Sequence, residues 1–294
     1  MINELKKLKC GKVLENVSLE KYTSYKLKEK AKTIVIVENV DNLIKLLAYL
    51  KENKIKHKIL GGGSNLIFEG DYDGVLVKLN LTNSSIDGRT IKVESGCNLI
   101  SIALKASKKG LTGFEFATGI PGTVGGAIYN NSGAYGSDMG YIVKNVTVLT
   151  PKLDIKVMDN KDLDYHYRTS FFKKHKDYVI LSATIVLQEG NKASIMDIIE
   201  DRRKRRIEAQ PLEYPSAGSV FRNPPGLYAG KLIEDIGYKG YRIGDAEVSL
   251  KHANFIVNRG SAKGSDIAKL IREIMKKVKE KYDVDLVLEQ EIVK

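Results

Sequence analysis

Two glycine-dense stretches constrain this chain more than any other feature of its sequence. The first is LGGGSNL, residues 60–66, and the second is TGIPGTVGGA, residues 118–127. Glycine loses more conformational freedom on folding than any other residue, so such runs are typical of places where the backbone turns tightly or approaches a ligand closely. Successive amides without side chains can also form a concave anion site. One stretch alone indicates a tight connection, whereas two in one chain favour a dinucleotide cofactor site.

Neither stretch matches the common nucleotide signatures. Gly61, Gly62 and Gly63 are consecutive, and the glycines from Gly119 to Gly126 run G-x-x-G-x-x-G-G, so both depart from G-x-G-x-x-G. No Gly-Lys-Ser or Gly-Lys-Thr ends either loop, so triphosphate hydrolysis loses its main support.

Composition indicates a folded protein without a membrane segment. The chain has 294 residues, 43% of them hydrophobic, which suffices for two or three modest domains with a real core. No apolar run approaches the roughly 20 residues of a membrane helix, and MINELKKLKCGK at the start has no apolar stretch of the signal-peptide type. We expect a cytoplasmic protein without membrane insertion, and we expect a monomer. Cys10 and Cys97 form no C-x-x-C pair and are interpreted as small apolar residues.

The formal net charge of +12 raises the question of nucleic-acid binding. The strongest basic run is RRKRR, residues 202–206, within a predicted helix. At about 100° per residue, five consecutive helical positions surround the axis and form no single stripe. The run is therefore interpreted as solvated, and no nucleic-acid partner is expected. A positive field would equally attract an anionic small substrate.

Hydrophobic periodicity predicts mixed α and β structure. Before the second glycine stretch, strands are expected at residues 33–37, 55–60, 74–79 and 91–94, and helices at residues 41–53 and 98–109. After it, strands are expected at residues 142–150, 155–158, 165–172 and 178–187. Helices at residues 193–209 and 265–282 and a final strand complete the chain. The natural division is a cofactor-binding region, residues 1–192, and a carboxy-terminal substrate-binding domain, residues 193–294.

With these elements placed, the chain resembles the UDP-N-acetylenolpyruvoylglucosamine reductases nearly from end to end. The resemblance is carried, in order, by LGGGSNLI, TGIPGTVGGA followed by NNSGAYG, YRTSFF, PSAGSVFRNP, AGKLIEDIGYKGYRIGDAEVS and KHANFIVN. The chain lacks an insertion after YRTSFF and so resembles the shorter family type. It departs from the family at Lys28–Lys30, where a glycine pair is usual, and at Tyr129–Ser132, which concern FAD binding and flavin packing.

The resemblance implies an α+β fold: a vanillyl-alcohol-oxidase-type (PCMH-like) FAD-binding fold of two subdomains, about residues 20–85 and 86–192, plus a carboxy-terminal α/β substrate domain. It implies that NADPH reduces bound FAD, which then reduces UDP-N-acetylglucosamine enolpyruvate to UDP-N-acetylmuramate for peptidoglycan synthesis. The expected FAD contacts come from the two glycine stretches and the turn after them, and are Gly61, Gly62, Gly63, Ser64, Asn65, Leu66, Thr118, Gly119, Ile120, Pro121, Gly122, Thr123, Gly125, Gly126 and Gly133.

Three catalytic residues follow from the resemblance. Arg168, expected on the YRTSFF strand, would face the enolate carboxylate formed by hydride addition. Ser219 would donate the proton to the enol, and Glu291 would close the site from the last strand. Without the resemblance, Arg168 would be interpreted as a surface ion-pair partner, Ser219 as a turn residue and Glu291 as a solvated glutamate.

The candidate substrate-binding residues and the function of the chain each have alternative interpretations. Asn223 matches a family residue near the diphosphate, and Arg222 and Lys231 suit an anion, although both also suit an ordinary solvated surface. His166 and His175 show no metal-ligand spacing, so no metal is expected. The alternative functions are a flavin-dependent oxidase of the same fold and a basic, non-catalytic nucleotide- or nucleic-acid-binding protein.

Overall fold

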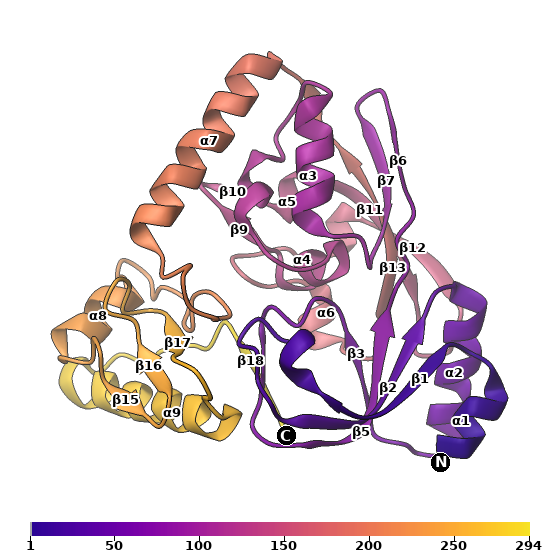
Figure 1. Cartoon of the computed structure of the whole chain (residues 1–294). Helices are drawn as coiled ribbons and strands as arrows, with labels where there is room; N and C mark the ends of the chain where they lie inside the picture. The colour runs from indigo at the N-terminus through magenta and orange to yellow at the C-terminus, as the bar shows by residue number, and fades with distance from the viewer. Residues whose placement is uncertain (1) are drawn as a thin grey trace. The chain divides into compact units, whose positions relative to one another are not determined.

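The computed structural model describes residues 2–294 and consists of two compact units (Figure 1). Unit 1 contains the chain up to Leu14, together with Thr33–Gly62 and Val75–Lys204. Unit 2 contains Glu15–Lys32, Gly63–Gly74 and Arg205–Lys294. The first glycine stretch therefore passes from one unit to the other after Gly62. The functional division at residue 192 stays a prediction.

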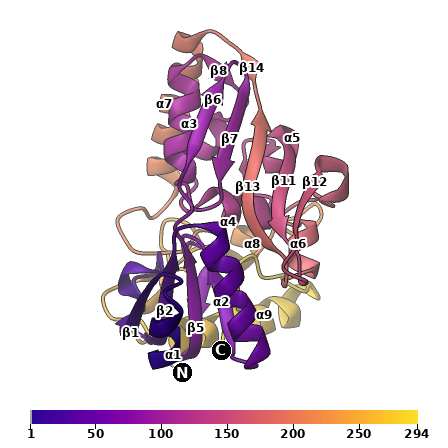
Figure 2. The same cartoon turned by 90° about the vertical axis from the view of Figure 1, so that its right-hand side faces the viewer.

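Most of a four-stranded sheet lies in unit 1, with strands in the order β1 (Lys12–Ser18), β2 (Lys30–Val37), β5 (Tyr72–Leu79) and β3 (His57–Leu60). Helix α2 (Val40–Glu52) lies along this sheet (Figure 2) and begins where the Asn39 side chain accepts from the Asn42 amide at 2.9 Å. Its buried leucines are Leu43, Leu46, Leu47 and Leu50. Burying each of them contributes about 1.5–3 kcal/mol, which fixes the helix on the sheet. Helix α1 (Ile2–Leu8) adds Leu5 to the same core.

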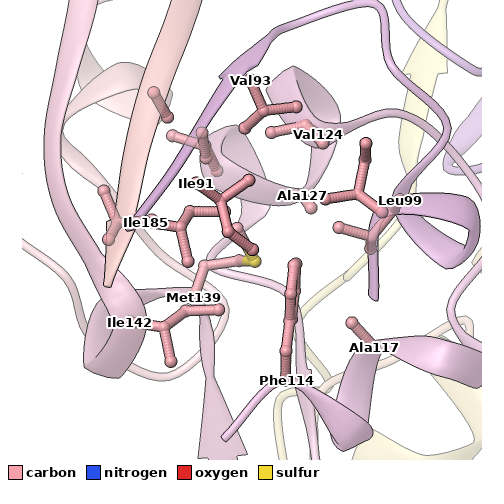
Figure 3. Packing of buried hydrophobic residues seen from close by; sticks show 14 of the residues in the cluster. Ile91, Val93, Leu99, Phe114, Ala117, Val124, Ala127, Met139, Ile142 and Ile185 are labelled. Carbon is pink, nitrogen blue, oxygen red and sulfur yellow. The ribbon is translucent and has the colours of Figure 1, made fainter. Parts of the chain in front are cut away.

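The larger core of unit 1 lies against a five-stranded antiparallel sheet. Its strands, in order, are β12 (Ile155–Asp159), β11 (Val143–Leu149), β13 (Val179–Val186), β7 (Thr90–Glu94) and β6 (Ser84–Asp87). Helices α3 (Leu99–Lys108) and α4 (Val124–Asn130) contribute buried residues to this core. Figure 3 shows Phe114 beside Met139 within the cluster, with Ile185 of the sheet and Leu99 of α3 on either side.

Short elements connect the larger ones in unit 1. They are β8 (Leu111–Thr112), the 3-10 helix η2 (Glu115–Gly119), β9 (Gly133–Ala134), β10 (Ser137–Asp138), α5 (Met139–Ile142), η3 (Asn160–Asp162), α6 (Phe171–Lys174) and β14 (Gln188–Glu189). Helix α7 (Lys192–Ala209) confirms the helix expected at residues 193–209. Within it, Arg202 stacks 4.6 Å from the ring of Tyr135, and Arg203 pairs with Glu200 at 3.4 Å. Members of the basic run thus have different partners, as expected for positions spread around a helix.

The strand predicted at residues 165–172 is wrong. The backbones of His166 and Thr169 exchange two hydrogen bonds, at 3.1 and 3.0 Å, and close a tight turn in which Arg168 has a φ of +54°. Helix α6 follows at once, and the Ser170 hydroxyl donates to the carbonyl of Tyr129 at 2.7 Å. The alternating aromatic residues favoured a strand, but a bond from a distant segment and a positive φ override that local preference.

Unit 2 is organised around helix α9 (Gly264–Tyr282) and two small sheets (Figure 1). One sheet has the order β15 (Arg242–Ile243), β16 (Ala246–Val248) and β17 (Ile256–Asn258); in the other, β18 (Glu291–Val293) runs parallel to β4 (Leu66–Phe68). The apolar face of α9 is buried, as expected from its spacing, through Ile267, Leu270, Ile271, Ile274 and Val278. Helix α8 (Ala229–Asp235) and the 3-10 helix η1 (Leu19–Lys21) complete the unit.

No helix within residues 2–294 combines the length and the apolar character needed to cross a bilayer.

Candidate functional site

The two glycine stretches approach each other backbone to backbone in unit 1. A Cβ atom added to Gly62 would lie 2.7 Å from the Cα of Gly122, and one added to Gly61 would lie 2.9 Å from the Thr123 hydroxyl oxygen. Side chains at either position would therefore collide with the other stretch. This close approach is the physical reason for glycine here.

Backbone amides at this contact remain available. Within residues 2–294, the amides of Gly62, Gly122 and Thr123 donate to no other group. The Thr123 hydroxyl accepts from the Gly126 amide at 3.3 Å and begins helix α4. Gly125 packs on Ser95, where an added Cβ would lie 2.7 Å from the serine Cβ. A glycine-rich turn with free amide donors fits a diphosphate-containing cofactor.

The second half of the first stretch is fixed within unit 2. Gly63 is buried with a φ of +64°, and its carbonyl accepts from the Ser24 amide at 3.3 Å. The side-chain amide of Asn65 donates to the carbonyl of Glu289 at 2.9 Å, and the Glu291 amide donates to the carbonyl of Asn65 at 2.9 Å. Asn65 is thus bound to the segment that carries the candidate glutamate.

Arg168 and Gly133 come together in unit 1. The Arg168 guanidinium donates from Nη2 to the carbonyl of Gly133 at 2.7 Å and lies 5.1 Å from the ring centre of Tyr167. Gly133 is buried, and an added Cβ would lie 2.9 Å from the Cα of Asp138. The tight turn and this carbonyl set the direction of the half-buried guanidinium.

Ser219 and Glu291 both belong to unit 2 and are linked through Gln290. The buried side-chain amide of Gln290 donates to the carbonyls of Ala217, Gly218 and Ser219 at 3.2, 3.1 and 3.3 Å. Its oxygen accepts from the Tyr25 hydroxyl at 2.9 Å. Tyr25 is fully buried, and this burial raises the pKa of its hydroxyl, which keeps it protonated as a donor. One amide therefore curls the Ser219 loop against the start of β18.

The segment after Ser219 is held by the Asn254 side chain. Asn254 is buried and makes both backbone bonds to Phe221, accepting from its amide at 3.0 Å and donating to its carbonyl at 2.8 Å. The His252 ring accepts from the Asn254 amide at 3.2 Å, and burial lowers the pKa of His252. Through these bonds, His252 and Asn254 support the backbone around Phe221.

The three candidate substrate-binding residues differ in whether their polar groups already have partners. Among the described residues, the buried Nε of Arg222 has no hydrogen-bond partner. The Asn223 side-chain oxygen accepts from the Ala229 amide at 3.1 Å, where α8 begins. Lys231 is exposed and pairs with Asp235 at 2.5 Å, so its ammonium is already neutralised. Arg222 is therefore the anchor with the greatest unmet need for an acceptor.

Sequence reasoning missed Gln290 and Tyr25. Gln290 directly precedes the candidate Glu291. The carbonyls that accept from its side chain belong to residues 71–73 positions earlier, and Tyr25 is 265 positions away. No local pattern identifies such contacts. Within residues 2–294, no three His, Cys, Asp or Glu side chains form a group that could hold a metal ion. Cys10 and Cys97 are both free and buried.

Comparison with known proteins gives two matching family models and full-length relatives. Residues 31–156 match an FAD binding domain, and residues 210–293 match the carboxy-terminal domain of UDP-N-acetylenolpyruvoylglucosamine reductase. The reductase of that name from Caldanaerobacter subterraneus subsp. tengcongensis is 46% identical, covering 100% of this chain and 98% of the relative. The one from Bacillus subtilis is 40% identical with the same coverage. The crystal structure of the Thermus caldophilus reductase is 30% identical with a TM-score of 0.81, covering 96% of this chain and 98% of that one. The predicted fold class is confirmed: an α+β FAD-binding fold followed by a carboxy-terminal domain of this type.

Proposed function

The chain belongs to the UDP-N-acetylenolpyruvoylglucosamine reductase family, and on that premise we propose that it uses NADPH to reduce UDP-N-acetylglucosamine enolpyruvate to UDP-N-acetylmuramate. The family makes it an oxidoreductase, and residues 31–156 form its FAD-binding domain. The observation that carries the detailed proposal is the link between Ser219 and β18 through Gln290, which holds a candidate proton donor beside the segment of Glu291.

FAD would be held at the free amides of the glycine turns. Gly61, Gly62 and Gly122 carry no side chains, and the amides of Gly62, Gly122 and Thr123 lack acceptors among the described residues, so these donors would receive the diphosphate. Bound FAD would accept hydride from NADPH and pass it to the vinyl carbon of the substrate. The fit rests on the shape and donors of the turn.

Arg168 would stabilise the anion formed on the substrate. Hydride addition to the vinyl carbon places negative charge on the adjacent carbon and its carboxylate, so the reaction needs fixed positive charge there. A planar, permanently charged guanidinium serves this task better than an ammonium. The bond from Arg168 to the Gly133 carbonyl holds the guanidinium before any substrate arrives.

Ser219 would supply the proton to that carbon. Its hydroxyl has no partner within residues 2–294, so it is available to a ligand, while its backbone is held by Gln290. A serine hydroxyl is a weak acid, and such proton transfer needs neighbours that stabilise the alkoxide or relay a proton. Glu291, which begins β18, would complete the proton path from the last strand.

Substrate binding would use the polar groups after Ser219. Arg222 offers an unpartnered Nε, so the diphosphate of a UDP-sugar would satisfy a donor that now has no acceptor among residues 2–294. Asn223, whose side chain is held at the start of α8, would help to orient the bound substrate. Lys231 would contribute only after leaving Asp235, which makes it the weakest of the three anchors.

A stopped-flow experiment tests the proposal in two steps. Mixing the FAD-loaded protein with NADPH should bleach the flavin, and mixing the reduced protein with the enolpyruvyl sugar under anaerobic conditions should restore the colour and yield UDP-N-acetylmuramate. Reoxidation by oxygen alone, with no response to the sugar, supports the oxidase alternative. A colourless protein that takes up no FAD supports the non-catalytic alternative.

A further inference from the structure

We propose that Lys78 supplies a fixed positive charge for the diphosphate of FAD at the glycine turns of unit 1. The inference rests on the proposed function only for the identity of the cofactor. It concerns a residue that the sequence did not single out, although a lone lysine within the apolar run GVLVKL of β5 is unusual.

The position of Lys78 is set by its strand. Its neighbours Val75, Leu76, Val77 and Leu79 are buried, and Lys78 itself is half-buried, opposite Leu60 in the parallel pair of β5 and β3. The chain after Leu60 enters the first glycine turn directly. The Lys78 ammonium reaches that turn and donates to the carbonyl of Gly61.

No carboxylate within residues 2–294 neutralises the charge on Lys78. Its one hydrogen-bond acceptor within residues 2–294 is the Gly61 carbonyl, and it takes part in no ion pair there. Burial lowers the pKa of Lys78, as expected for an ammonium that has lost water without gaining an anion. Since a buried charge is costly unless paired, a bound anion would relieve a real cost at this position.

The ammonium and the free amides border the same turn. Gly61 and Gly62 lie against Gly122 and Thr123, and the amides of the last three have no acceptor among the described residues. An ammonium has three donors, and the Gly61 carbonyl uses one of them. Amide donors fix the orientation of a diphosphate, whereas Lys78 would add the charge that a glycine turn cannot provide.

The competing explanation is that Lys78 only braces the turn through Gly61. The two roles differ in how FAD binding responds to salt. Loss of a brace would weaken FAD binding equally at low and high salt, whereas loss of a counter-charge would remove an ionic attraction that salt screens.

The test titrates apo-protein with FAD and with riboflavin, following flavin fluorescence, for the wild type, Lys78→Met and Lys78→Arg. Lys78→Met keeps the stem and removes the charge, so FAD should bind roughly 10- to 100-fold more weakly, as for the loss of a charged hydrogen bond, with riboflavin unchanged. Lys78→Arg should stay near the wild type. Lys92→Met, which removes an exposed lysine from strand β7, should leave both affinities unchanged.

Salt gives a second readout. Added KCl should weaken FAD binding by the wild type more than by Lys78→Met, because the lost pair is the one that salt screens. Equal weakening of FAD and riboflavin in Lys78→Met, no weakening of either, or an equal effect of KCl on the wild type and Lys78→Met overturns the inference.

A loss of FAD affinity must be distinguished from a failure of the variant to fold. Thermal unfolding of each apo-variant checks the fold. If Lys78→Met does not fold, NMR titration of the labelled Lys78 ammonium in the wild type decides, since FAD should raise its pKa and an unchanged pKa overturns the inference. Neither experiment uses NADPH or the sugar substrate, so a failed reductase reaction and a failed role for Lys78 are told apart.

Discussion

The side-chain amide of Gln290 donates to the carbonyl oxygen of Ser219 at 3.3 Å, and the same nitrogen reaches the two preceding carbonyls. Gly218 has a φ of +77°, which lets the loop curl so that consecutive carbonyls converge on one donor. The Tyr25 hydroxyl holds the other end of the amide, so its oxygen and nitrogen have distinct partners. The geometry of the candidate proton donor therefore depends on a residue from the last strand region and on one near the start of the chain.

Gln290→Leu should destabilise unit 2 and slow the sugar half-reaction. The change removes the donor to three carbonyls and leaves the buried Tyr25 hydroxyl without its acceptor, which costs about 1–3 kcal/mol for an unsatisfied buried group. Urea unfolding should show the loss. Single-turnover oxidation of reduced enzyme should be slower, with reduction by NADPH unchanged.

Tyr25→Phe provides the control for this network. If Tyr25 and Gln290 act together, the double variant should lose less stability than the sum of the two single changes. Gln188→Leu, an exposed glutamine in β14, should change neither stability nor turnover appreciably. Additive losses in the double variant would contradict a shared network.

Ser219→Ala should leave flavin reduction by NADPH intact and slow the second half-reaction by about 10²–10⁴-fold, the usual contribution of general acid catalysis. The hydroxyl has no partner within residues 2–294, so its removal should cost little stability. Stopped-flow measurement of both half-reactions checks this directly. Equal losses in both would mean that the serine assignment is wrong.

Arg168→Lys should slow the sugar half-reaction by about tenfold or more while keeping the charge. Lysine lacks the planar fork that donates to the Gly133 carbonyl and would face the substrate carboxylate at the same time. The comparison variant is Arg203→Lys, on the exposed surface of α7. Normal oxidation of the reduced flavin by the sugar in Arg168→Lys would count against the proposed role.

Sequence patterns predicted the elements whose structure depends on neighbours along the chain. Helices α2, α3 and α9 carry apolar residues at helical spacing over long segments, and each forms close to its predicted bounds. The glycine stretches predicted a close approach of the backbone to a ligand, which stays a prediction, and the structure shows that Gly62 also lies against Gly122. These features follow from periodicity and from the absence of side chains, which are both local properties.

The rest depends on contacts between distant segments. Two features accompany the turn at residues 166–169: the Ser170 hydroxyl bonds to Tyr129, 41 residues away, and Arg168 has a positive φ. Hydrophobic periodicity reports neither of them. The short strands β15, β16 and β17 are too brief for a period-two pattern to register. Gln290 has no distinguishing neighbour in the sequence, so its role becomes visible only when its partners are placed.

Protonation of His252 should make the protein less stable in mild acid. Burial, followed by the nearby Lys239, lowers the pKa of His252 below its ordinary value of 6.5. The unfolded state then binds the proton more readily, so stability falls as the pH drops below about 6.5 and stops falling below the folded pKa. His252→Gln should flatten this part of a pH–stability curve from urea unfolding, whereas the exposed His57→Gln should not. A wild-type curve that is flat below pH 6.5 would contradict the prediction.

Gly62→Ala should destabilise unit 1 and weaken FAD binding together, because its added Cβ would lie 2.7 Å from the Cα of Gly122 and no flexible side chain is there to move away. Overpacking of this kind costs about 1–3 kcal/mol. Gly70→Ala is the matched control, since an added Cβ meets nothing within 4 Å. Unfolding curves and FAD titrations of the two variants separate a steric effect from a general effect of replacing glycine. If Gly62→Ala kept wild-type stability and FAD affinity, the close contact of the two stretches would have no energetic role.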